Sequence, residues 1–144
     1  MYRSQNELKI LPLNARSLLP KMESLQLLVE AEDLDVICVV ETWLSAEILD
    51  AEISIQGYQC YRHDRNRHGG GIVVYVRDCL SATSIVDNIE LELLTLSLTV
   101  KNRKTTIGTF YRPPNSSSEL MDALYTCLEN LDVTYLTNLI LLGA

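Results

Sequence analysis

The sequence of 144 residues has no apolar run that approaches the roughly 20 residues needed to cross a bilayer. Its first residues carry no apolar core of the signal-peptide type. It has only four cysteines and no CxxC pair, and two of them, Cys38 and Cys127, lie in apolar patterns typical of small buried hydrophobes. We therefore expect an intracellular protein, nuclear or cytoplasmic, that is not secreted, crosses no membrane and has no zinc site.

Basic residues are also scarce, because 12 Lys and Arg stand against 19 Asp and Glu and leave a net charge of −7. This balance argues mildly against a nucleic-acid-binding surface, which is usually basic. The basic residues that are present gather in Arg62–His68, in Lys101–Lys104 and at Arg112. Exposure to solvent at a hairpin tip is the simpler explanation of Arg62–His68.

Three kinds of functional motif are absent. Gly69–Gly71 is followed by a predicted strand, whereas a phosphate-binding loop needs a Lys-Ser/Thr pair and a helix at that place. His63 and His68 have no cysteine or carboxylate at metal-ligand spacing. No serine or cysteine has the sequence surroundings of a nucleophile. The sequence thus gives no support to a P-loop, a histidine metal site or nucleophilic catalysis.

The chain does have alternating strands and helices with short connections, in a composition of 47% hydrophobic and 22% charged residues that is typical of globular domains. Helices are predicted over Leu18–Ala31 and after the capping box Ser116-x-x-Glu119. These patterns favour one α/β domain with mixed strands. Strands are predicted over Glu7–Asn14, Asp35–Glu41, Gly57–Arg62, Ile72–Arg77, Glu92–Val100, Thr105–Tyr111 and Asn138–Leu142.

The most informative stretch is the apolar strand that begins at Asp35 and ends in Glu41. An uninterrupted apolar run indicates a strand buried on both faces, and groups at the carboxyl ends of such strands line the crevice where ligands bind. Glu41 is well placed to hold a hard cation such as Mg²⁺, which prefers one or two carboxylates with water and phosphate. The alternative, that Glu41 only caps the turn leading to Trp43, stays open.

Topology brings a second residue to the same edge. The first two predicted strands and the helix between them form a βαβ crossover, and its parallel strands share their carboxyl edge, so Asn14 and Glu41 should lie side by side. An amide there can orient the carboxylate or hold a phosphate oxygen. Tyr111, at the end of a hairpin strand, can reach this edge as well. The plainer alternatives are a turn residue for Asn14 and core packing, with the hydroxyl at the rim, for Tyr111.

A family resemblance is carried by four motifs in order: Leu13–Leu18, Glu41–Leu44, Gly69–Ile72 and Tyr111–Pro114. The series resembles the exonuclease–endonuclease–phosphatase family, and within it the endonuclease domain of LINE-type (non-LTR) retrotransposons. The likeness runs over nearly the whole chain. It implies an α/β fold, the mixed-sheet half of a four-layer α/β sandwich of the endonuclease/exonuclease/phosphatase type. Residues 1–144 would then be a partial domain, truncated at its carboxyl-terminal side.

The activity implied by the resemblance is DNA nicking by a phosphodiesterase that depends on Mg²⁺ or Mn²⁺. Glu41 matches the family's metal-binding glutamate, Asn14 the asparagine that helps to position the scissile phosphate, and Tyr111 the active-site tyrosine. Arg65 and Arg112 would be phosphate contacts, although hairpin-tip solvation is the simpler explanation of Arg65. A non-enzymatic α/β binding module and a phosphatase-type relative remain as alternatives.

One departure from the family pattern is as informative as the match. In the family the last strand continues into Gly-Asp-x-Asn, whose aspartate and asparagine are catalytic, whereas Ala144 stands here in the aspartate's place. The family's late aspartate and histidine are absent too. Because catalytic residues that act as a unit fail together, we expect this chain to be inactive alone. A half sandwich should also be marginally stable, because one face of its sheet is bare. That face should bind the missing carboxyl-terminal half or a second copy of the chain.

Overall fold

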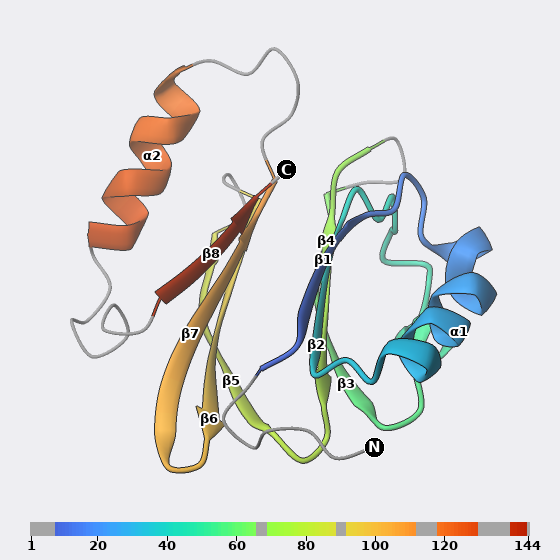
Figure 1. Ribbon diagram of the computed structural model, residues 1–144. Coiled ribbons are helices and arrows are strands. Elements are labelled where there is room, and N and C mark those ends of the chain that lie inside the picture. Colours follow the sequence, from blue (N-terminus) through green and yellow to red (C-terminus); the bar gives the residue numbers. More distant parts are fainter. Residues whose placement is uncertain (1–7, 66–68, 89–91, 112–117, 130–138, 144) are drawn as a thin grey trace.

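The computed structural model describes residues 8–65, 69–88, 92–111, 118–129 and 139–143. In these residues two four-stranded sheets lie face to face, with strand orders β1-β2-β4-β3 and β5-β6-β7-β8. One helix lies on the outer side of each sheet, so the layers run helix, sheet, sheet, helix (Figure 1). The α/β fold class predicted from the sequence is therefore confirmed.

The first sheet contains the predicted βαβ crossover. Its first two strands pair in parallel, and the helix between them packs on the outer face of the sheet. Every residue of the second strand is buried, as the uninterrupted apolar run indicates. The elements are β1 (Ile10–Asn14), a 3₁₀ helix (Leu19–Lys21), α1 (Met22–Glu32), β2 (Val36–Val40), a 3₁₀ helix (Asp50–Ile53), β3 (Tyr58–His63) and β4 (Ile72–Arg77).

The second sheet contains one strand that the sequence analysis missed. This strand, β5, lies at the edge of the sheet, and its sequence Ser-Ala-Thr-Ser-Ile-Val-Asp-Asn does not alternate apolar and polar residues in the way by which a half-buried strand is recognised. The last strand, β8, pairs in parallel with β7. Ser116 of the predicted capping box lies outside the described residues. The elements are β5 (Ser81–Asn88), β6 (Leu93–Val100), β7 (Arg103–Phe110), α2 (Ser118–Glu129) and β8 (Leu139–Gly143).

The inner faces of the two sheets pack against each other. Side chains of β2 and β4 pack there against Leu94, Leu96 and Leu98 of β6 and against Ile107 of β7. The expectation of a bare inner sheet face was wrong. It assumed that half of the family fold is one of its two sheets, whereas this chain supplies four strands to each sheet and the inner faces cover each other.

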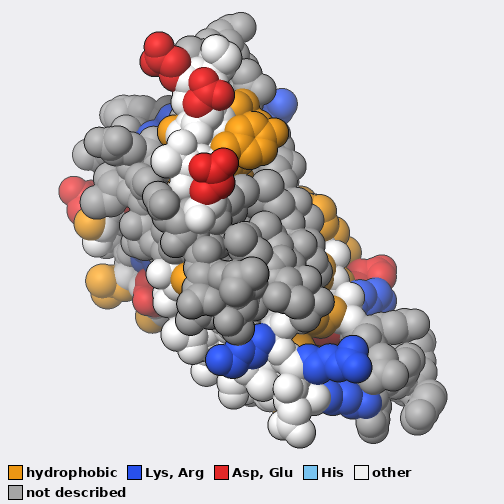
Figure 2. Space-filling model, turned by 90° about the vertical axis from the view of Figure 1, so that its left-hand side faces the viewer, with side chains coloured by type: hydrophobic (Ala, Val, Ile, Leu, Met, Phe, Trp, Pro, Cys, Tyr) orange, Lys and Arg blue, Asp and Glu red, His pale blue; other side chains and the backbone are white. Residues whose placement is uncertain are grey.

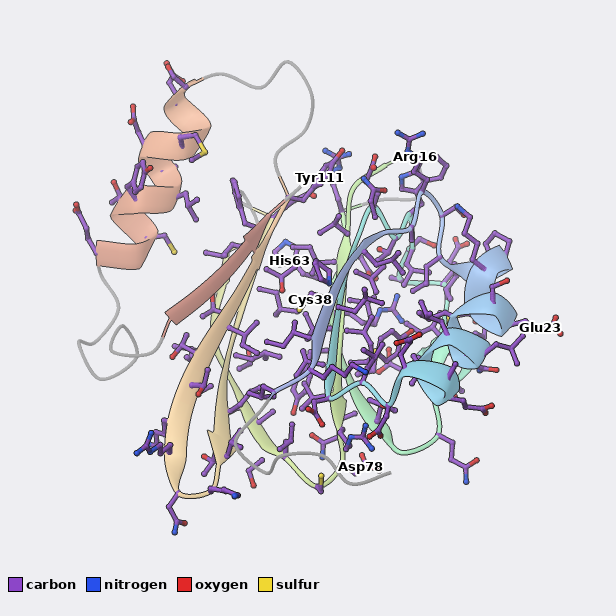
Figure 3. All side chains as sticks on the ribbon, viewed as in Figure 1. Arg16, Glu23, Cys38, His63, Asp78 and Tyr111 are labelled. Atoms are coloured by element: carbon purple, nitrogen blue, oxygen red, sulfur yellow. The ribbon has the colours of Figure 1, made fainter. Side chains whose placement is uncertain are left out.

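None of the helices in the described ranges is long and apolar enough to span a membrane. The four cysteines are free thiols. Cys38 lies between the two sheets (Figure 3), where burial raises the pKa of its thiol to about 11 and a hydrogen bond with Thr109 opposes that rise. The position of Cys38 in the core agrees with its apolar sequence context.

Candidate active site

One edge of the sandwich collects strand ends from both sheets (Figure 1). In the first sheet, Asn14 at the end of β1 lies opposite Val40 at the end of β2. In the second sheet, Phe110 at the end of β7 lies opposite Gly143 at the end of β8. The carboxyl ends of four strands thus meet at one edge, the arrangement that holds ligand sites in open α/β sheets.

Backbone hydrogen bonds fix the loop after β1 against the segment after β2. The Ala15 N–H donates to the Val40 carbonyl at 2.9 Å, and the Ser17 N–H donates to the Glu41 carbonyl at 3.0 Å. Asn14 and Glu41 therefore follow neighbouring strands side by side, as the crossover predicts. Asn14 is exposed and Glu41 is half-buried.

The same two loops hold their backbone in an uncommon conformation. Arg16, Ser17, Glu41 and Trp43 have φ values of 45°, 81°, 53° and 55°, in the left-handed region that glycine adopts most readily. Each such residue costs on the order of 1–3 kcal/mol, and such residues persist where the surrounding structure determines them, commonly at functional sites. Figure 3 shows Arg16 and Tyr111 at this edge of the molecule.

Tyr111 joins the second sheet to Glu41. Its side chain is buried, and its hydroxyl forms a hydrogen bond with the Glu41 carboxylate. Burial, this hydrogen bond and the charge of Glu41 all raise the pKa of Tyr111, and Arg65 opposes the rise. The phenol therefore stays protonated at neutral pH and serves as a donor. Of the predicted site residues, Asn14, Glu41 and Tyr111 are brought to one place.

An ion pair between Arg65 and Glu92 lies beside Tyr111. The sequence analysis named Arg65 as a candidate but missed Glu92. Arg65 Nε lies 2.9 Å from Glu92 Oε1, and Glu92 precedes β6 with its side chain 8% exposed. Glu92 Oε2 accepts the Gly71 N–H at 3.4 Å, and the Glu92 carbonyl accepts the Tyr111 N–H at 3.1 Å. The signal in the sequence was a carboxylate placed directly before an apolar strand.

Gly69 and Gly70 make room for this pair, and Gly71 makes room for Thr42. Gly70 and Gly71 have φ values of 66° and 92°, and a Cβ on Gly70 would overlap both the Arg65 guanidinium and the Glu92 carboxylate. The Gly70 carbonyl also accepts the Trp43 N–H at 2.9 Å, which ties the segment to the loop of Glu41. As the sequence indicates, this is no P-loop, because β4 follows it directly.

Other candidates lie elsewhere. The basic hairpin residues Lys101, Arg103 and Lys104 are exposed at the end of the second sheet opposite to Tyr111. Figure 2 shows basic side chains gathered there, and acidic ones on the outer surface of α2. His63 is buried between the sheets (Figure 3), and Arg112 lies outside the described residues.

The residues of this edge fit one hard divalent cation. Within the described ranges no group of three or more His, Cys, Asp or Glu residues gathers. Mg²⁺ requires less from the protein, because it keeps several waters and binds through one or two carboxylates plus substrate phosphate. Glu41, half-buried and oriented by Tyr111, supplies one carboxylate next to the amide of Asn14.

Comparison with known proteins assigns the fold to a family. The family model described as Endonuclease/Exonuclease/phosphatase family matches residues 5–138. The chain belongs to this family. The resemblance carried by the four sequence motifs is thereby confirmed, and the endonuclease/exonuclease/phosphatase family comprises both nucleases and phosphatases. No curated protein sequence matches the chain.

Solved structures share the fold of this endonuclease/exonuclease/phosphatase chain at low sequence identity. The endonuclease domain of TRAS1, a telomere-specific non-LTR retrotransposon, is 12% identical, with a TM-score of 0.69 over 95% of this chain and 58% of that one. An AP endonuclease from Archaeoglobus fulgidus is 15% identical, with a TM-score of 0.66 over 95% and 56%. A mannosyl-6-phosphatase from Bacteroides thetaiotaomicron is 11% identical, with a TM-score of 0.65 over 95% and 64%. The chain spans less than two thirds of each.

Proposed function

We propose that this domain hydrolyses phosphodiester bonds in DNA with the help of Mg²⁺ or Mn²⁺, as the amino-terminal part of an endonuclease of retrotransposon type. The observation that supports this most directly is the hydrogen bond between Tyr111 and Glu41. It places a carboxylate and a neutral phenol from different sheets at the strand edge where Asn14 also lies. Two sequence motifs, Thr42-Trp-Leu and Tyr111-Arg-Pro-Pro, favour the retrotransposon branch over a phosphatase-type relative.

Each of the three residues has a role that follows from its chemistry. Glu41 would hold the metal ion, which when bound supplies polarisation of the phosphoryl oxygens and offsets charge in the transition state. The exposed amide of Asn14 would donate to an oxygen of the scissile phosphate. Tyr111 would keep the Glu41 carboxylate in one orientation by donating a hydrogen bond from its hydroxyl group. Partners that orient a metal ligand in this way commonly contribute 10–100-fold in metal affinity, an approximate range.

Metal affinity tests the role of Glu41. We expect Mn²⁺ to bind the chain, and Glu41→Ala to weaken that binding by at least about tenfold, because the variant loses the carboxylate that follows β2 beside Asn14 and accepts a hydrogen bond from the Tyr111 hydroxyl. Binding is measured by the loss of the electron paramagnetic resonance signal of free Mn²⁺. Glu47→Ala is the matched control, since it removes the same charge from an exposed position on the following loop.

Equal Mn²⁺ affinity in Glu41→Ala and Glu47→Ala would contradict the proposed metal site. The outcome would then favour the non-enzymatic alternative, in which this α/β domain binds a partner without metal. Direct support for that alternative would be a specific protein complex that forms equally well in EDTA.

A further inference from the structure

Glu92 is a buried carboxylate for which the proposed reaction has no role. Burying a charge is costly unless it is paired. Glu92 Oε1 forms an ion pair with Arg65 Nε but accepts no hydrogen bond within the described ranges, and Oε2 accepts the Gly71 N–H. The Nε–H of Arg65 donates to the Gly69 carbonyl at 3.2 Å. The Glu92 carboxylate and the Gly69 carbonyl therefore both hold the guanidinium at its Nε atom.

The contacts of Arg65 differ from those of Arg62, an ion-paired arginine on the strand before it. Arg62 is 14% exposed, and its Nε and both terminal nitrogens contact Asp50, Asp64 and two backbone carbonyls. Arg65 is 41% exposed, and its contacts with Glu92 and Gly69 both run through Nε. Arg62 thus has its donors used within the fold, whereas among the described residues the terminal nitrogens of Arg65 have no hydrogen-bond partner.

Arg65 also lies next to the candidate active site. The Glu92 carbonyl accepts the Tyr111 N–H, and Arg65 and Glu92 both act electrostatically on the Tyr111 hydroxyl. A guanidinium whose Nε is fixed presents two terminal nitrogens in one plane, which matches two oxygens of a phosphate in a bidentate contact. An anion bound there would lie beside the Glu41–Tyr111 pair.

We propose that Glu92 is a positioning residue that holds Arg65 as a clamp for a phosphodiester of the nucleic-acid strand, next to the Glu41–Tyr111 site. The identity of the ligand rests on the proposed function. The clamp needs no metal, because its donors are the terminal nitrogens of Arg65. Gly69 and Gly70 belong to the same arrangement, since a Cβ on either would displace the guanidinium.

The test measures binding of a short fluorescein-labelled DNA by anisotropy, in EDTA and over a series of KCl concentrations. Arg65→Ala should weaken binding about tenfold, because one charge-assisted contact is lost. The slope of log K against log salt should become less steep by about 0.9, the contribution of one neutralised phosphate. Arg65→Lys keeps the charge but not the planar fork, so it should retain the salt slope and still lose affinity.

Glu92→Gln gives the decisive result, because two explanations predict opposite signs. Removing a negative charge from a chain of net charge −7 should strengthen DNA binding if only overall charge matters. If Glu92 positions Arg65, the same variant should weaken binding several-fold, and it should have no further effect in an Arg65→Ala background. Asp50→Asn is the matched control, because it removes the same charge from the carboxylate partner of Arg62.

Binding that is unchanged or tighter in Glu92→Gln, in a variant that keeps its circular dichroism spectrum, would overturn the positioning role. An unaltered chain that binds no DNA at low salt, or an Arg65→Ala variant that binds normally, would overturn the clamp itself, whether or not Glu92→Gln folds. These results are independent of Mn²⁺ binding at Glu41, so the clamp and the metal site can fail separately.

Discussion

Gly70→Ala should lower the free energy of unfolding by about 2–4 kcal/mol. The residue is buried with φ +66°, where alanine is strained, and its Cβ would overlap the Arg65 guanidinium and the Glu92 carboxylate. Relieving the overlap requires the ion pair to separate or the backbone to shift, and overpacking of this kind commonly costs 1–3 kcal/mol, an approximate range. Urea denaturation of both proteins measures the change.

Gly57→Ala is the control that separates strain from collision. Gly57 has φ +88°, and no atom lies within 4 Å of the position that its Cβ would take. It should therefore lose only about 1 kcal/mol, from backbone strain alone. Arg65→Ala should recover part of the loss in the Gly70→Ala background, because it removes one of the two groups in the overlap. Equal losses at Gly57 and Gly70 would contradict the packing explanation.

The sequence predicted those parts of the site that follow from strand order. Asn14 and Glu41 end neighbouring strands of a parallel crossover, so their proximity depends only on the recognition of two strands and one helix. Tyr111 was placed at the same edge because it ends a hairpin strand, although the sequence did not show that its hydroxyl reaches Glu41.

The ion pair of Arg65 and Glu92 could not be predicted in the same way. It joins a loop of the first sheet to the beginning of a strand in the second, and neither residue belongs to a periodic pattern. The same limit explains the wrong expectation of a bare sheet face. Strand patterns show which faces are apolar, but how one chain divides its strands between two sheets depends on pairing between distant segments.

A polypeptide of these 144 residues alone should not nick supercoiled DNA, even with saturating Mg²⁺ or Mn²⁺. In the proposed site Glu41 would hold the metal ion and Asn14 would position the phosphate. Glu92, the other carboxylate beside Tyr111 in the described ranges, is ion-paired with Arg65 and is therefore not available as a general acid or base. Proton transfer by such a group is commonly worth about 10²–10⁴-fold, and the loss of one member disables a set that acts together.

The position of β8 gives this prediction its structural basis. Gly143 lies opposite Phe110, so a chain that continues beyond β8 delivers its next residues beside Tyr111 and Glu41. Plasmid nicking is compared between the 144-residue polypeptide, its Glu41→Ala variant and a longer polypeptide that continues past β8. Nicking by the short chain that disappears in Glu41→Ala would contradict the prediction, whereas nicking that survives the substitution comes from a contaminating nuclease. Glu41-dependent nicking by the longer polypeptide alone would place the remaining catalytic groups after β8.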